Sequence, residues 1–114
     1  MVQTGTFAYG IIDAEGRCGR DFTLHERTFR HALELANDSS IDKDLFADPA
    51  YYDAAVISKR LKVEGIDRLT PEMVLDLEGE DSDLLANAIV TLDQRRTEFR
   101  KEQQAAQKAA AGPA

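Results

Sequence analysis

The chain has a single cysteine, Cys18, so a disulfide within the molecule is impossible. A lone cysteine is typical of a reducing compartment, and its place in an apolar strand pattern predicts a small buried side chain rather than a reactive thiol. No apolar stretch approaches the roughly 18 residues of a membrane span, and the first residues lack the basic start and apolar run of a secretory signal. We therefore expect a cytosolic protein that does not bind membranes.

Sequence motifs that assemble reactive groups are also missing. There is no Gly-x-Ser-x-Gly, no glycine-rich phosphate loop before a helix, and no nucleophile with an evident base. The two histidines, His25 and His31, fall on different predicted elements, and no third ligand lies at metal spacing. We expect no enzyme activity, no cofactor and no metal. A small hydrolase or metal enzyme remains an alternative only if distant carboxylates and one histidine meet in a cleft.

Acidic residues outnumber basic ones, and the formal net charge is -7. This acidity argues against nucleic acid as a partner, since most of the surface would repel phosphates. The acidic residues from Glu78 to Asp83 lack the spacing of a calcium-binding loop and are expected to complement the positive end of a helix. The basic residues from Arg95 to Lys101 are interleaved with Glu98, which is typical of a solvated helix with ion pairs.

Two short strands, over residues 7–12 and 18–24, flank the turn Asp13-Ala14-Glu15-Gly16. Alternation of apolar residues predicts that the strands form a hairpin with one buried face. The residues expected on that face are Phe7, Tyr9, Ile11, Cys18, Phe22 and Leu24.

From Phe29 onward the apolar spacing becomes helical. Thr28 is expected to cap a first helix with the stripe Phe29, Ala32, Leu33 and Ala36, which ends near Asn37-Asp38-Ser39-Ser40. Asp48-Pro49 predicts the start of a second helix that runs to Gly65, and Thr70-Pro71-Glu72 starts a third that runs to Gly79. Asp81 or Ser82 is expected to cap the last and longest helix, which buries Leu84, Leu85, Ala88, Ile89 and Leu92.

The predicted fold class is therefore α+β, with an N-terminal β-hairpin followed by about four α-helices, mostly helical and with a long last helix. We expect one domain over residues 1–99. Residues 100–114 form an Ala/Gln-rich tail with helix-forming residues but almost nothing to pack against. This tail is expected to be a frayed helix or disordered in isolation, and ordered only with a partner.

Several short motifs together resemble the tail assembly chaperones of long-tailed bacteriophages, including Mu-like phages. Members show a strand pair around Gly-x-x-Asp-x-x-Gly, a second strand that ends in Leu-x-x-x-Thr before a helix, a segment like Leu-(Ser/Thr)-Pro-Glu, and an acidic step into a Leu-rich helix. The counterparts here are Gly10-Ile11-Ile12-Asp13-Ala14-Glu15-Gly16, Leu24-His25-Glu26-Arg27-Thr28, Leu69-Thr70-Pro71-Glu72 and Asp81-Ser82-Asp83-Leu84-Leu85. Many members carry Arg-Glu-Pro-Thr where this chain has His25-Glu26-Arg27-Thr28 and lacks the proline.

The resemblance implies a protein of the infected host's bacterial cytoplasm that is absent from the mature virion. Such chaperones bind the long helical tape measure protein, keep it from aggregating, and give way as tail tube protein polymerises around it. In many phages a ribosomal frameshift near the end of the reading frame adds an extension that recruits tube protein. Residues 103–111 would suit the region where such an extension starts.

Apolar side chains on the last helix are the candidate contacts for a client, because their stripe continues past the expected end of the core. The candidate partner-binding residues are Leu85, Ile89, Leu92 and Phe99. Formation of a homo-oligomer through the same helix is an equally physical use of this stripe. The main rival is a small acidic phage-encoded inhibitor, which would bind a host protein in place of a phage structural protein.

Overall fold

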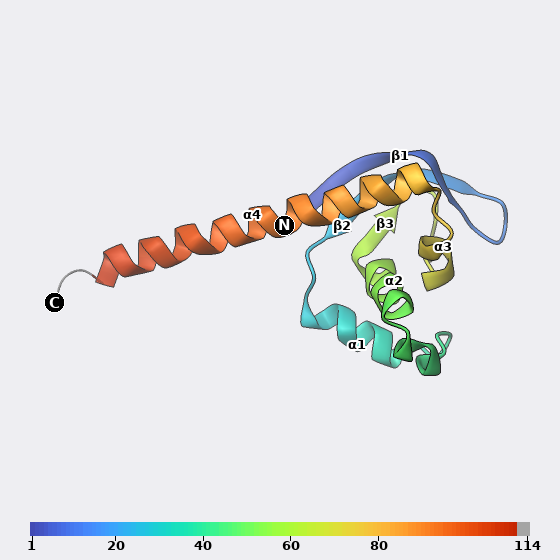
Figure 1. Ribbon diagram of the computed structural model, residues 1–114, viewed down its shortest axis with the longest axis horizontal. Helices are drawn as coiled ribbons and strands as arrows, with labels where there is room; N and C mark the ends of the chain where they lie inside the picture. The colour runs from blue at the N-terminus through green and yellow to red at the C-terminus, as the bar shows by residue number, and fades with distance from the viewer. Residues whose placement is uncertain (112–114) are drawn as a thin grey trace.

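A three-stranded antiparallel sheet and a very long C-terminal helix form the frame of the molecule (Figure 1). The computed structural model describes residues 1–111, so the last three residues of the expected tail lie outside the described part. The elements in chain order are β1 (Val2–Ile12), β2 (Cys18–His25), α1 (Phe29–Asn37), the 3-10 helix η1 (Lys43–Ala47), α2 (Pro49–Arg60), β3 (Leu61–Val63), α3 (Pro71–Leu75) and α4 (Gly79–Ala111). The predicted α+β class, with a hairpin followed by helices and a long last helix, is confirmed.

The sheet has the order β1-β2-β3, and the third strand was not predicted. The second helix was expected to run to Gly65, but it ends at Arg60 and the chain passes directly into β3. Lys62 pairs with Thr23 of β2, and the side chains on either side of it, Leu61 and Val63, are buried. Pairing with β2 therefore ends the helix where the local sequence has no helix-breaking residue.

The buried face of the hairpin differs from the alternating pattern at two positions. The register of β1 against β2 shifts between Thr6 and Ile11, so strict alternation is lost there and Tyr9 points to solvent. Cys18 is exposed, and its Sγ lies 3.4 Å from the carbonyl oxygen of Tyr9. The predictions that Tyr9 shares the buried face and that Cys18 is a buried side chain are therefore wrong.

The helix starts that the sequence predicts are largely correct. Asp48 accepts a hydrogen bond from the backbone N–H of Ala50 (3.0 Å), and Thr70 Oγ1 accepts one from Met73 (3.3 Å). At α1 the amide of Thr28 donates to Nδ1 of His31 (3.0 Å), so the histidine completes the cap. The third helix ends at Leu75 rather than at Gly79, which instead begins α4.

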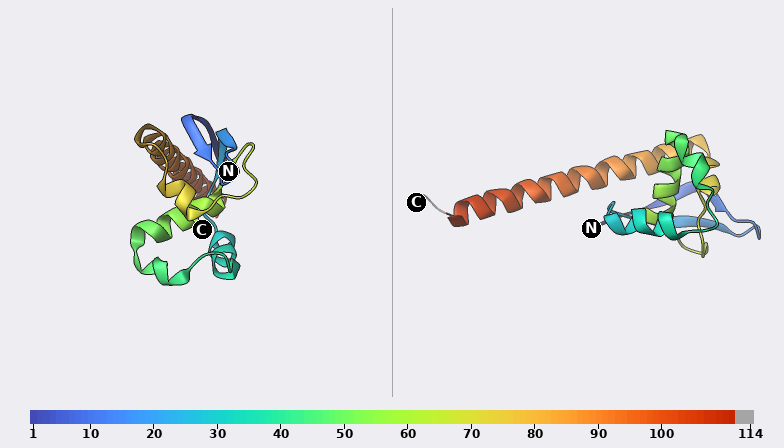
Figure 2. Two further views of the ribbon diagram at one scale, coloured as in Figure 1. Left: turned by 90° about the vertical axis from the view of Figure 1, so that its right-hand side faces the viewer. Right: turned by 90° about the horizontal axis from the view of Figure 1, so that it is seen from below.

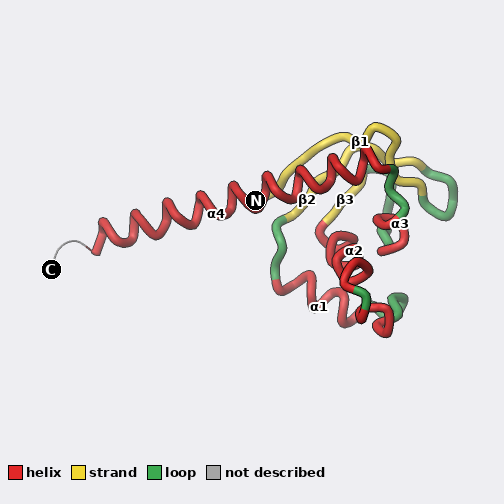
Figure 3. Tube along the Cα trace, viewed as in Figure 1, coloured by secondary structure: helices red, strands yellow, loops and turns green. Residues whose placement is uncertain are grey.

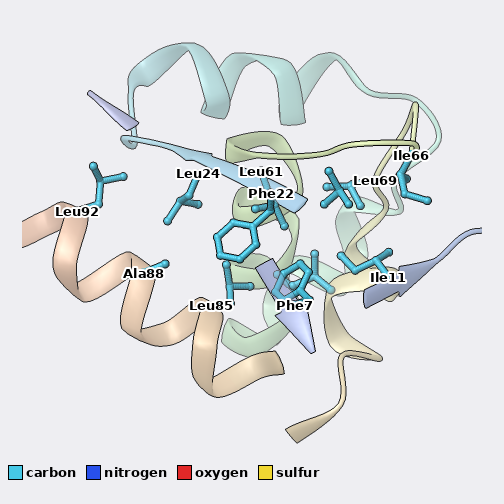
Figure 4. Close-up of a cluster of buried hydrophobic side chains, with 13 residues drawn as sticks. Phe7, Ile11, Phe22, Leu24, Leu61, Ile66, Leu69, Leu85, Ala88 and Leu92 are labelled. Carbon is cyan, nitrogen blue, oxygen red and sulfur yellow. The ribbon is translucent and has the colours of Figure 1, made fainter. Parts of the chain in front are cut away.

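Two hydrophobic clusters lie on either side of α2. The larger one joins the sheet to α4, and in Figure 4 the side chains of Leu85, Ala88 and Leu92 project from α4 toward Phe22 and Leu24. Phe7 and Phe22 stack at its centre, with ring centroids 4.5 Å apart. The smaller cluster joins α1 and the following segment to α2 through Leu35, Ile41, Tyr51, Ala55 and Val56.

The helix α4 continues far beyond the rest of the molecule (Figures 1 and 2). Its 33 residues make the molecule 62 Å long against 32 Å and 22 Å in the other directions. The radius of gyration is 17.0 Å, whereas a compact domain of this length would have one of about 13 Å. Among residues 1–111, no other element lies alongside the end of α4 (Figure 3). Residues 100–111 of the expected tail are thus an exposed helical arm.

Candidate partner-binding site

The four residues predicted to contact a partner divide into two kinds. Leu85 (4 % exposed) and Leu92 (0 %) are part of the core beneath the sheet, and in this conformation they are covered by the protein itself. Ile89 is half-buried, packs against the same core, and lines a surface cleft. Phe99 is 49 % exposed. Only Ile89 and Phe99 are therefore accessible to a partner.

Phe99 faces a groove whose other aromatic wall comes from a distant part of the sequence. Phe29, the first residue of α1, lies on this groove with Met1, and its side chain is 76 % exposed. The groove has a volume of about 580 Å³. We call it the aromatic groove. Its lining residues are Met1, Glu26, Arg27, Thr28, Phe29, Arg96, Phe99, Arg100 and Gln103.

Sequence reasoning missed Phe29 because the residue fits the apolar stripe of its own helix. That stripe, with Ala32, Leu33 and Ala36, is exposed along its length, and α1 packs on α2 through Leu35 instead. A helix of nine residues with a single buried side chain leaves one apolar side without a partner. The sequence signal that could have identified Phe29 is its position at the first helical residue, where a side chain projects beyond the packed part of the helix.

A second cleft of about 520 Å³ adjoins the aromatic groove between α2 and α4. Half-buried Ile57 and Ile89 form its apolar floor together with Val56. Its charged residues are four arginines and two aspartates, and three of the arginines also line the aromatic groove. We call it the arginine cleft. Its lining residues are Arg27, Asp53, Val56, Ile57, Arg60, Ile89, Asp93, Arg96, Thr97 and Arg100.

Arg60 occupies an unusual place in the arginine cleft. It is the last residue of α2 and only 5 % exposed, and its Nε donates a hydrogen bond to the carbonyl oxygen of His25 at 3.0 Å. Its Nη2 is buried and has no hydrogen-bond partner among residues 1–111. Burial lowers the pKa of the guanidinium from its ordinary value, Asp93 opposes this shift, and the neighbouring Arg27 and Arg96 add to it.

The two histidines, which the sequence places on different elements, line one shallow groove together with Glu26 and Glu34. His31 Nδ1 accepts the amide proton of Thr28, so its lone pair is already engaged and cannot also take a proton from the Thr28 hydroxyl 3.3 Å away. Burial lowers the pKa of His31, which favours the neutral ring that this hydrogen bond requires. The contacts of His31 are therefore those of a helix cap.

One acidic residue at the start of α4, Asp81, binds the backbone of β1. Asp81 is completely buried, and its carboxylate accepts hydrogen bonds from the amides of Ala8 (2.6 Å), Tyr9 (3.0 Å) and Gly10 (2.9 Å). These amides belong to the stretch where β1 loses its regular register, and Gly10 supplies a positive φ of 94° there. The prediction that Asp81 or Ser82 caps the last helix is wrong, because the helix begins at Gly79 and Asp81 instead binds the sheet.

Within residues 1–111, no group of three or more histidine, cysteine or acidic side chains is arranged to hold a metal ion. No helix of the described chain has both the length and the apolar character needed to cross a membrane. Comparisons with protein-family models, with curated proteins and with solved structures found no significant match to this chain.

Proposed function

We propose that this chain is a tail assembly chaperone of a long-tailed bacteriophage, which binds the tape measure protein, assists polymerisation of the tail tube and is absent from the mature virion. The observation that supports this proposal best is the aromatic groove, which Phe29 of α1 and Phe99 of α4 both line with exposed side chains. Adjacent exposed aromatic side chains are typical of protein-binding surfaces. The motifs that resemble the family supply the choice of client.

The expected client is a long helical protein, and the aromatic groove is suited to binding a short segment of one such helix. Burying the parts of Phe29 and Phe99 that are still exposed would contribute roughly 2 to 4 kcal/mol, which is comparable to or smaller than the cost of association. A single site would thus bind weakly. Many copies along a long client would still cover it, and weak individual sites allow them to leave as tube subunits arrive.

The exposed end of α4 extends this binding surface. Residues 100–111 are helical, rich in alanine and glutamine, and solvent-exposed on all sides. The five alanines of this arm lose no side-chain conformational freedom at an interface, because alanine has no rotamers to restrict. We assign this arm the contact with tail tube protein or with the next chaperone molecule along the client.

The test is co-expression with a tape measure protein, chosen from a reading frame next to the one that encodes this chain. Wild-type chain should keep the tape measure protein in the soluble fraction and co-purify with it. Phe99→Asp and Phe29→Asp should each reduce the co-purified client about tenfold, since each places a charge against apolar client surface. Circular dichroism should show that both variants remain folded.

Val90→Asp is the matched control. Val90 is exposed on the same helix, and its nine-residue separation from Phe99 puts it on the opposite side of α4. This variant should retain the client. Retention of the client by the Phe99→Asp variant, or equal loss with Val90→Asp, would contradict the proposal. Capture of a host protein in preference to the tape measure protein would favour the inhibitor instead.

A further inference from the structure

We propose that the arginine cleft binds a carboxylate from an acidic, amphipathic helical segment of the partner, recognised by Arg60, Arg96 and Arg100. This inference rests on the proposed function for the identity of the partner as the client. It adds the chemistry of the segment that is bound. The client segment should be apolar on one side and carry glutamate or aspartate beside that apolar side.

The arginine cleft differs in charge from the rest of the protein. The protein as a whole is acidic, with a net charge of -7, yet the arginine cleft gathers four arginines against two aspartates. Among residues 1–111, none of these four arginines forms an ion pair, whereas Arg17 and Arg68 elsewhere on the surface do. A concentration of unpaired positive charge in an acidic protein favours an acidic partner.

The guanidinium of Arg60 is buried in the arginine cleft and only partly hydrogen-bonded. A charged group removed from water is costly unless it is paired, and Arg60 has one hydrogen bond to a backbone carbonyl and a buried Nη2 without a partner in the described chain. The side chain is anchored by that bond, so its position does not depend on a ligand. A carboxylate that enters the cleft would offset the charge of a guanidinium that is already in place.

The shape of the combined surface favours a helical occupant. The arginine cleft and the aromatic groove share Arg27, Arg96 and Arg100, so they form one continuous surface along α4 from Ile89 to Gln103. The 15 residues from Ile89 to Gln103 span 14 helical steps, or about 21 Å, which matches about four turns of a bound helix. Ile89 supplies an apolar side chain near one end of this surface, and Phe99 supplies one toward the other end. A helix with apolar and acidic positions therefore complements the whole surface.

The experiment uses two labelled 20-residue helical peptides with the same leucine face, one with glutamate and one with glutamine on the flanking positions. Fluorescence anisotropy should show that the full chain binds the glutamate peptide about tenfold more tightly than the glutamine peptide. The net negative charge of the protein would by itself repel the glutamate peptide, so this preference would have to come from a local site. An Arg96→Gln/Arg100→Gln double variant should remove most of the preference.

Arg20→Gln is the matched control, because Arg20 also donates its Nε proton to a backbone carbonyl, that of Phe7 at 3.0 Å, but lies outside the arginine cleft. This variant should bind both peptides as the wild-type chain does. Arg60 itself is tested without substitution: its Nε–H resonance should shift when the glutamate peptide is added, while that of Arg20 stays in place.

Equal binding of the two peptides, or an unchanged Arg60 resonance, would overturn the inference. If both peptides bind equally and Phe99→Asp abolishes their binding, the proposed function stands and only the acidic recognition fails. A stable dimer of this chain that the Arg96→Gln/Arg100→Gln variant dissociates would also overturn the inference, since the acidic start of α4 in a second copy would then be the occupant. If the wild-type chain prefers the glutamate peptide but does not co-purify with the tape measure protein, the proposed function alone would be contradicted.

Discussion

The two halves of α4 have the same backbone but are held in place differently. From Gly79 to Leu92 the helix contributes Leu85, Ala88 and Leu92 to the core and Asp81 to the backbone of β1. From Asp93 to Ala111 no side chain is buried. The first half is therefore stabilised by buried tertiary contacts. The second half is bound to β1 through Arg95, which donates hydrogen bonds to the carbonyl oxygen of Val2 (2.8 Å) and to Oε1 of Gln3 (3.0 Å), and toward its end it depends on the intrinsic helix preference of its residues.

Under the proposed function, this one continuous helix has two separate roles. The first half packs against the sheet, and the second half is the part that we propose presents the aromatic groove and the arm to a partner. The boundary falls where the apolar stripe leaves the sheet, between Leu92 in the core and Phe99 in the aromatic groove. Substitutions on either side of this boundary should have different effects on stability and binding.

The largest effect on stability is expected for Asp81→Ala. This change removes the acceptor for the amides of Ala8, Tyr9 and Gly10, and it should lower the free energy of unfolding by about 3 to 6 kcal/mol. Urea denaturation followed by circular dichroism measures the loss. Asp83→Ala, at an exposed position two residues further on, is the control and should change stability by less than about 0.5 kcal/mol. Similar losses in both variants would mean that Asp81 does not anchor α4.

A second comparison is between Leu92→Ala and Phe99→Ala. Leu92 is fully buried, so the truncation should cost about 2 to 5 kcal/mol through lost burial and the cavity left behind. Phe99 is half-exposed and outside the core, so its truncation should cost less than about 1 kcal/mol. Thermal unfolding of the two variants measures the difference. A loss at Phe99 as large as that at Leu92 would place the end of the anchored half beyond residue 99.

The smallest effect on stability is expected for Gln104→Pro. A proline there should break the arm and reduce the helical circular dichroism signal, yet leave the free energy of unfolding within about 0.5 kcal/mol of wild type. The same substitution at exposed Thr91, in the anchored half, should cost about 3 kcal/mol or more. If the Gln104→Pro variant were destabilised by more than about 1 kcal/mol, the arm would have to pack on the body of the protein.

Only part of the candidate site could be predicted from the sequence. Periodicity identifies Ile89 and Phe99 as apolar positions of a helix, but it also selects Leu85 and Leu92, because a helical stripe looks the same whether it faces a core or a partner. The groove residue Phe29 and the cleft residue Arg60 belong to other helices. Their proximity to α4 depends on contacts between residues far apart in the chain.

By itself the sequence determined the class of the fold, the hairpin turn, the helix starts at Phe29, Pro49 and Pro71, and the fact that the last helix is the longest, because turns, caps and periodicity are local properties. Tertiary structure alone decided that Leu61–Val63 is a strand, that Tyr9 faces solvent, that Asp81 binds β1, and that the arginine cleft adjoins the aromatic groove. Each of these features depends on a neighbour supplied by a distant segment, which local patterns do not encode.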